Sequence, residues 1–260
     1  MKPTILDVRM YPFFLGVAVC VGVGTSLLCA RRAGLPLLRW VLLQVCLVLA
    51  ALVGAKAYSV FQEGQPFPFP PSAISTDGFR YPGGLLATIV ALPVLASLFR
   101  IRIAELADVV AIPIALAMAT VRVGCFLQGC CFGPVSSALV AVRFPANSPP
   151  WNEHLIEGLI GVTDPQSLPV HPLQLYFGLW SLVVALVLIW WWPRRRHAGQ
   201  LFLLLLLLHE SGKAGLELLR VPQRADLRLA STAVALLGAT ALLLVAARGA
   251  RRPQAVVAQS

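Results

Sequence analysis

Long apolar runs, separated by short polar segments, dominate the pattern of this chain. Runs that reach the length needed to cross a bilayer, about 17–25 residues, fall at roughly 12–30, 37–60, 83–99, 105–127, 172–192, 199–219 and 229–247. The pattern predicts an all-α polytopic membrane protein, in which seven transmembrane helices form a single membrane domain over residues 1–260.

The composition supports a membrane location and changes how the charge is interpreted. Hydrophobic residues make up 58% of the chain and charged residues only 12%, with a net charge of +10. Soluble domains carry about 25% charged residues. Basic residues that flank membrane spans explain a surplus of this kind. We therefore expect the lipid bilayer, and no nucleic acid, as the partner of these basic residues.

The distribution of arginines predicts the orientation of the spans. The clusters follow the first, third, fifth and seventh spans and comprise Arg31, Arg32, Arg39, Arg100, Arg102, Arg194, Arg195, Arg196, Arg248, Arg251 and Arg252. A seven-span layout puts all of them on one side, which the positive-inside rule makes cytoplasmic. The N-terminus is then outside and the C-terminus inside. A secretory signal peptide at residues 1–30 is the competing interpretation, but the stretch lacks a small-x-small cleavage pattern and its double arginine follows the apolar run.

The longest non-spanning segment, residues 133–171, predicts a small extracytoplasmic lobe. Apolar residues recur within it at helical spacing, opposite Glu153 and Glu157, and they are Trp151, Leu155, Ile156, Leu159 and Ile160. Two interpretations are open for this helix. It lies on the outer membrane surface as an amphipathic helix, or it packs inside the lobe.

Helix arithmetic places several charged residues at one depth. The fourth span begins inside near residue 105, so Arg122 lies about 25 Å towards the outside at 1.5 Å per residue. The sixth span begins inside near residue 199, which puts Lys213, Glu217 and Arg220 about 21, 27 and 31 Å along. Tyr11 and His171 also begin spans from the outside. These groups are expected to meet near the outer boundary of the hydrocarbon, where phospholipid headgroups lie.

The sixth span carries its polar residues on one face. Glu210, Lys213, Glu217 and Arg220 are spaced i, i+3, i+7 and i+10, and His209 borders the same stripe. Two arginines and a lysine at this depth suit a phosphate group. Structural alternatives are open, because Arg122 and Glu217 can form a buried pair that joins two spans, and His171 can cap a helix.

Residues 122–133 combine charge, thiols and backbone freedom more densely than the rest of the chain. The stretch begins with Arg122 and contains Cys125, Cys130 and Cys131 among three glycines. Thiols can bind a metal, form a disulfide or act as nucleophiles.

Six segments, in the same order along the chain, resemble the prolipoprotein diacylglyceryl transferases. They are Met10-Tyr11, 77–85, 107–111, 122–129, 171–176 and 213–220. The resemblance implies an enzyme of the bacterial cytoplasmic (inner) membrane with no cofactor and no metal. Its partners are phosphatidylglycerol, which donates the diacylglyceryl group, and the signal peptide of a preprolipoprotein, whose lipobox cysteine accepts it.

The resemblance also implies roles for residues of this chain. Arg122, Arg220 and Lys213 hold the phosphate, and Glu217 orients an arginine or the glycerol hydroxyls. Tyr11 and Gln128 donate hydrogen bonds to the headgroup. The backbone of the substrate site includes Gly83, Gly84 and Gly129.

Several positions depart from the family pattern. Pro82 stands where the family has a histidine that is often assigned as the base, so His209 or His171 is expected to activate the acceptor thiol. Cys125 and Gln128 replace asparagines, Cys130 replaces a glutamate and Lys213 replaces an arginine. Two alternatives follow. One is a diverged transferase with Cys130 or Cys131 as nucleophile. The other is a non-enzymatic protein whose three cysteines form a disulfide or bind a metal with His171.

Overall fold

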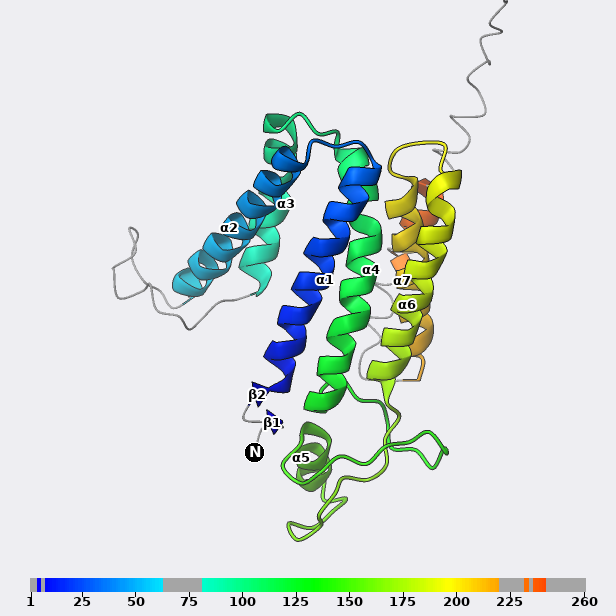
Figure 1. The fold of residues 1–260 in the computed structure, drawn as a ribbon. Coiled ribbons are helices and arrows are strands. Elements are labelled where there is room, and N and C mark those ends of the chain that lie inside the picture. Colours follow the sequence, from blue (N-terminus) through cyan, green and yellow to red (C-terminus); the bar gives the residue numbers. More distant parts are fainter. Residues whose placement is uncertain (1–3, 6–7, 63–80, 220–231, 234–235, 242–260) are drawn as a thin grey trace, which may run out of the picture. The chain divides into compact units, whose positions relative to one another are not determined.

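A computed structural model of the chain describes residues 4–5, 8–62, 81–219, 232–233 and 236–241. Two short strands precede the first helix and pair antiparallel, β1 (Thr4–Ile5) and β2 (Val8–Arg9). The helices that follow are α1 (Met10–Arg32), α2 (Leu37–Gln62), α3 (Tyr81–Leu98), α4 (Ile103–Gln128), α5 (Pro149–Ile156), α6 (Leu173–Trp191), the 3₁₀ turn η2 (Trp192–Arg194) and α7 (Gln200–Glu217) (Figure 1). The strands were not predicted, because two residues are too short to show an alternating pattern.

The six long helices coincide with the first six predicted spans. Four of them, α1, α2, α4 and α6, are long and apolar enough to cross a membrane, with mean hydropathies of 2.0–2.2. The apolar part of α3 is shorter, and α7 is interrupted by charged residues. The protein is therefore a helical membrane protein, as predicted. The seventh predicted span, 229–247, lies largely outside the described residues.

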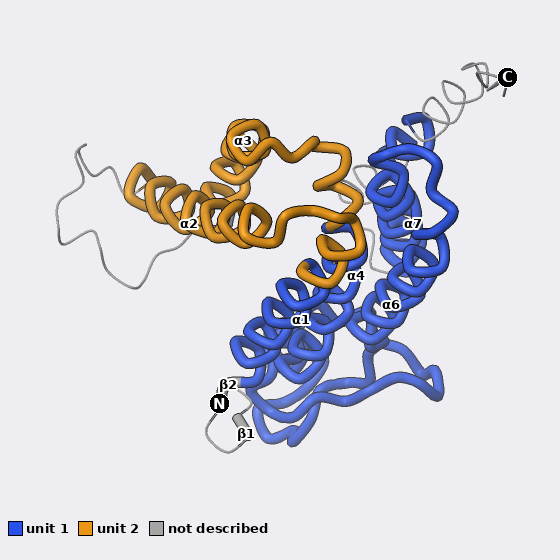
Figure 2. The backbone as a smooth tube through the Cα atoms, turned by 45° about the horizontal axis from the view of Figure 1, so that its top comes forward, with its two compact units in different colours: residues 1–26, 110–260 blue, residues 27–109 orange. Residues whose placement is uncertain are grey.

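The chain divides into two compact units, which are considered separately (Figure 2). Unit 2 comprises Leu27–Val109, and its main feature is the packing of α2 against α3. A Cβ atom added to Gly54 would lie 2.6 Å from the carbonyl oxygen of Gly83, and one added to Gly84 would lie 2.9 Å from that of Ala51. Small residues of this kind let helix backbones approach closely in a membrane. Gly83 and Gly84 thus have a packing role, and their contact with substrate stays a prediction.

The α2–α3 contact gives a test of this packing role. Gly83→Ala is expected to lower the stability of the protein by about 1–3 kcal/mol, because the added methyl overlaps the backbone of α2. Unfolding in a denaturing detergent, followed by circular dichroism without substrate, measures the effect. Gly24→Ala in α1 is the matched control, since no atom lies within 4 Å of its added Cβ. Equal stability of the two variants would contradict the packing role.

Unit 1, Met1–Ser26 with Val110–Ser260, contains α6 and α7 as an antiparallel pair together with α1 and α4 (Figure 1). Glycines again mark the close contacts. A Cβ on Gly124 of α4 would lie 2.7 Å from the Cβ of Phe14 in α1, and one on Gly178 of α6 would lie 3.2 Å from the Cβ of Arg122. These contacts bring α1 and α6 against α4 near the end where Arg122 lies.

The segment between α4 and α6 forms a packed lobe around α5. Trp151 and His154 are buried, at 6% and 3% exposure. The indole N–H of Trp151 donates to the carbonyl of Asp164 over 2.8 Å, and the backbone N–H of Leu168 donates to Nδ1 of His154 over 3.2 Å. The helix therefore packs inside the lobe through Trp151 and His154, and its position on the outer membrane surface stays a prediction.

The predicted helix was too long at its C-terminal end, because its apolar face was expected to continue to Ile160. The helix α5 ends at Ile156, which is 86% exposed, and Leu159 and Ile160 follow in the next turn. Gly158 adopts a left-handed backbone conformation with φ of +71° and donates to the carbonyl of Leu155. A glycine in this conformation ends a helix readily because it has no Cβ, so the helical spacing does not continue through Ile160.

Candidate functional site

The charged residues singled out in the sequence lie near the lobe end of the helices in unit 1. Arg122 lies in the last turns of α4, whose end leads into the lobe, and α6 begins where the lobe ends (Figure 1). Lys213 and Glu217 lie in the last turns of α7, which runs antiparallel to α6. Tyr11 is the second residue of α1 and 36% exposed. Arg220 lies outside the described residues.

Arg122 is held against the aromatic ring of Phe177. Its guanidinium carbon lies 4.8 Å from the centroid of that ring, which belongs to α6. Gly178, the next residue, has no side chain to keep α6 away from Arg122. Such a cation–π contact is worth about 0.5–2 kcal/mol. The contact uses the face of the guanidinium, whereas the N–H donors point outward in its plane, so the edge is suited to bind an anion.

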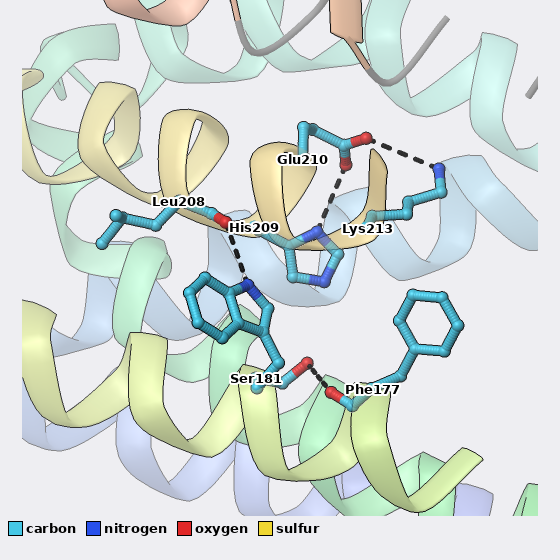
Figure 3. Close-up of polar contacts among 7 residues, drawn as sticks. Phe177, Ser181, Leu208, His209, Glu210 and Lys213 are labelled. Atoms are coloured by element: carbon cyan, nitrogen blue, oxygen red, sulfur yellow. Dashed lines mark hydrogen bonds and ion pairs between the residues drawn. The ribbon is translucent and has the colours of Figure 1, made fainter. Parts of the chain in front are cut away.

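Three side chains of α7 form a hydrogen-bonded cluster, which we call the α7 triad: His209, Glu210 and Lys213. Glu210 Oε1 lies 3.2 Å from Nδ1 of His209, and Glu210 Oε2 lies 3.5 Å from Nζ of Lys213. The side chains are 12%, 17% and 32% exposed, respectively. Figure 3 shows the imidazole pointing from α7 towards α6, on the side where Phe177 lies.

The partner of His209 determines what its ring can do. An ionised carboxylate only accepts hydrogen bonds, so the tautomer that fits this contact has the proton on Nδ1. In this tautomer the lone pair is on Nε2, which is the ring atom able to accept a proton.

Trp180 and Gly212 hold α6 and α7 together beside this triad. The indole N–H of Trp180 donates to the carbonyl of Leu208 over 2.9 Å, and a Cβ on Gly212 would overlap the indole. Sequence reasoning missed both residues, and also Phe177 and Gly178. The sequence signal that could have identified three of them is their position, because Phe177, Gly178 and Trp180 lie within four residues after the 171–176 segment.

The helix α4 ends in a Schellman motif built around Gly129. This glycine has a φ of +75°, its N–H donates to the carbonyl of Phe126 over 3.0 Å, and the N–H of Cys130 donates to that of Cys125 over 3.1 Å. A Cβ on Gly129 would lie 3.2 Å from the ring of Phe144 in the lobe. Gln128 is thus the last residue of α4, and Gly129 turns the chain tightly against the lobe.

Three cysteines flank this turn: Cys125 lies in the last turn of α4, and Cys130 and Cys131 follow Gly129. Hydrogen bonding to Cys125, hydrogen bonding to Cys131 and burial raise the pKa of the Cys130 thiol. Because the thiolate is the reactive form, this environment disfavours Cys130 as a covalent nucleophile.

The six cysteines, all of them in described segments, are in the reduced form in the structure. Across the described part of the chain, no three His, Cys, Asp or Glu side chains are grouped to hold a metal ion. His171 instead has Nδ1 3.2 Å from the hydroxyl of Tyr176, where the lobe meets α6.

The family model described as "Prolipoprotein diacylglyceryl transferase" matches residues 2–248. The chain belongs to this family. A relative from Clostridium perfringens, named phosphatidylglycerol–prolipoprotein diacylglyceryl transferase 2, is 24% identical over 188 residues, which are 71% of this chain and 68% of the relative.

Relatives with the name phosphatidylglycerol–prolipoprotein diacylglyceryl transferase come from other bacteria too. That from Synechococcus elongatus is 30% identical over 187 residues, covering 71% of this chain and 61% of the relative. That from Rhodopirellula baltica is 29% identical over 170 residues, covering 62% and 35%. The chain therefore spans about two thirds or less of the length of these relatives.

Pro82 is exposed in the first turn of α3 and has no group that can take up a proton. The imidazole of His209, which lies beside the carboxylate of Glu210, has such a group. Glu217, at the end of α7, is buried with 6% exposure.

Proposed function

We propose that this protein transfers a diacylglyceryl group from phosphatidylglycerol to the lipobox cysteine thiol of a preprolipoprotein, and releases glycerol phosphate. Family membership supports the reaction type. The observation that carries the proposal for this chain is the placement of Arg122, stacked on Phe177, at the same end of α4, α6 and α7 as Lys213. The cationic edge of Arg122 meets the need of a reaction whose leaving group is a phosphate monoester.

The topology that goes with this proposal has seven spans in a single membrane domain, residues 1–260, of the bacterial cytoplasmic membrane. The N-terminus is outside, the C-terminus is cytoplasmic, and the lobe around α5 is extracytoplasmic. This orientation puts Arg194 of η2 inside, where it stacks on Trp190 at 4.1 Å. Aromatic and basic residues are enriched at such an interface.

The chemistry assigns separate tasks to the cations and to the base. The acceptor sulfur forms a bond to the glyceryl carbon while the bond from that carbon to the phosphate oxygen breaks. Arg122 and Lys213, with Arg220, stabilise the negative charge that collects on the departing phosphate. Tyr11 and Gln128 donate hydrogen bonds to the headgroup, and Glu217 orients an arginine or the glycerol hydroxyls.

The acceptor thiol has to lose its proton, and we assign the base to His209. Its Nε2 is the atom that accepts the proton, because the N–H at Nδ1 donates its hydrogen bond to the carboxylate of Glu210 in the tautomer that fits this contact. His171 is the second candidate, but its Nδ1 is engaged with a tyrosine hydroxyl, which stabilises an imidazolium less than a carboxylate does. The proton passes to Nε2, and Glu210 stabilises the charge that results.

A lipidation assay tests the proposed function. Proteoliposomes that contain the full-length protein and phosphatidylglycerol are incubated with a peptide that carries a lipobox cysteine. The expected product is the peptide with one diacylglyceryl group on its thiol, detected by mass spectrometry together with an equal amount of glycerol phosphate. Vesicles of phosphatidylcholine alone serve as the control. If no lipidated peptide forms and a lipid adduct appears on Cys130 or Cys131, the diverged transferase is the better description.

A further inference from the structure

The end of α4 brings two thiols together through the geometry of its backbone. In the Schellman motif around Gly129, the side chains three positions before and two positions after the cap residue contact each other. Both of these residues are cysteines here, Cys125 and Cys130. The thiol of Cys130 donates to the backbone carbonyl oxygen of Cys125 over 3.6 Å.

Contacts from other segments keep the pair in place. The amide Nε2 of Gln174, a fully buried residue of α6, donates to the carbonyl of Cys130 over 2.7 Å. Gly129 is confined by Phe144 and Pro149 of the lobe, which lie 3.2 and 3.3 Å from the site of an added Cβ. A disulfide needs its two Cα atoms about 4.4–6.8 Å apart, and the hydrogen bond from the N–H of Cys130 to the carbonyl of Cys125 holds the two backbones close together.

We propose that Cys125 and Cys130 are a dithiol that oxidises to a disulfide across the C-terminal cap of α4. The oxidant is a small disulfide of the glutathione class, R–S–S–R. Cys130 is the more exposed of the two, so the oxidant reaches its sulfur first, and the small fraction that ionises in alkaline solution attacks the oxidant and releases one R–SH. Cys125, which is buried next to it, then attacks the mixed disulfide and releases the second R–SH. Two thiols lose two protons and two electrons, and the oxidant gains them.

Whether Cys125 and Cys130 form a disulfide can be tested by peptide mapping, without measuring the transfer reaction. Purified full-length protein in detergent is treated with oxidised glutathione at about pH 8.5, where a larger share of the thiols ionises, or with dithiothreitol. The remaining thiols are then alkylated. Trypsin cleaves after Arg122 and Arg143, which places Cys125, Cys130 and Cys131 in one peptide. Chymotrypsin cleaves after Phe126 and separates Cys125 from the other two.

The expected result is that alkylated cysteines in the tryptic peptide fall from three to one on oxidation, with Cys131 alkylated. The chymotryptic fragments that carry Cys125 and Cys130 should be joined and should separate with dithiothreitol. Three alkylated thiols after oxidation, or a bond that involves Cys131, would overturn the proposal.

Matched variants localise the bond. Cys131→Ser should form the disulfide as before, and Cys130→Ser should lose it. Cys46→Ser, which removes a thiol from α2, should behave like the unaltered protein. If Cys130→Ser does not accumulate as folded protein, the peptide map of the unaltered chain decides alone.

Discussion

Arg122→Ala is expected to reduce the kcat of diacylglyceryl transfer by about 10²–10³-fold, the usual effect of removing one donor that stabilises a developing oxyanion. The guanidinium is stacked on Phe177 with its edge available to an anion. Alanine removes the charge and the paired N–H donors together. The rate of peptide lipidation in proteoliposomes, at saturating phosphatidylglycerol, measures the loss.

Arg122→Lys distinguishes the contribution of the positive charge from that of the paired N–H donors of the guanidinium. Lysine keeps the positive charge but loses the paired donors, so an intermediate loss of about tenfold is expected. Arg194→Ala is the matched control, since this arginine also stacks on an aromatic ring, that of Trp190, but in η2 at the other end of α6. It should retain full activity. An Arg122→Ala protein that is folded and as active as Arg194→Ala would rule out the phosphate-binding role.

His209→Gln is expected to reduce kcat by about 10²–10⁴-fold with little change in the KM for phosphatidylglycerol, because general bases contribute in this range. Glutamine can occupy a similar volume and still hydrogen-bond to Glu210, but it cannot take up a proton at neutral pH. Steady-state kinetics with varied lipid and varied peptide separate the loss in kcat from a loss in binding. Thermal unfolding of the purified variant controls for a defect in folding.

Two further variants test how the α7 triad works. Glu210→Gln should cause a smaller loss in kcat than His209→Gln, because Glu210 positions the imidazole and the imidazole remains able to take the proton. His171→Gln should leave kcat within a few-fold of the unaltered protein. The assignment of the base would be reversed if His171→Gln abolished transfer while His209→Gln remained active.

Much of the fold could be predicted because hydropathy is a local property. The six long helices begin and end within about two residues of the apolar runs. The lobe followed from the length of the non-spanning segment, but the course of its helix did not. Gly158 ended α5 before the apolar spacing did, and burial of Trp151 and His154 depended on residues such as Asp164 and Leu168 from the far side of the lobe.

The sequence by itself determined the membrane class, the order of the helices, the family and the end of the bundle to which the charges belong. The tertiary structure alone decided which groups meet. It placed Arg122 on Phe177, joined His209 to Glu210, and put Gly83 against α2. Such contacts depend on how each helix is rotated and how closely it approaches its neighbour. An apolar run of sufficient length is compatible with many rotations, and only packing between side chains selects one of them.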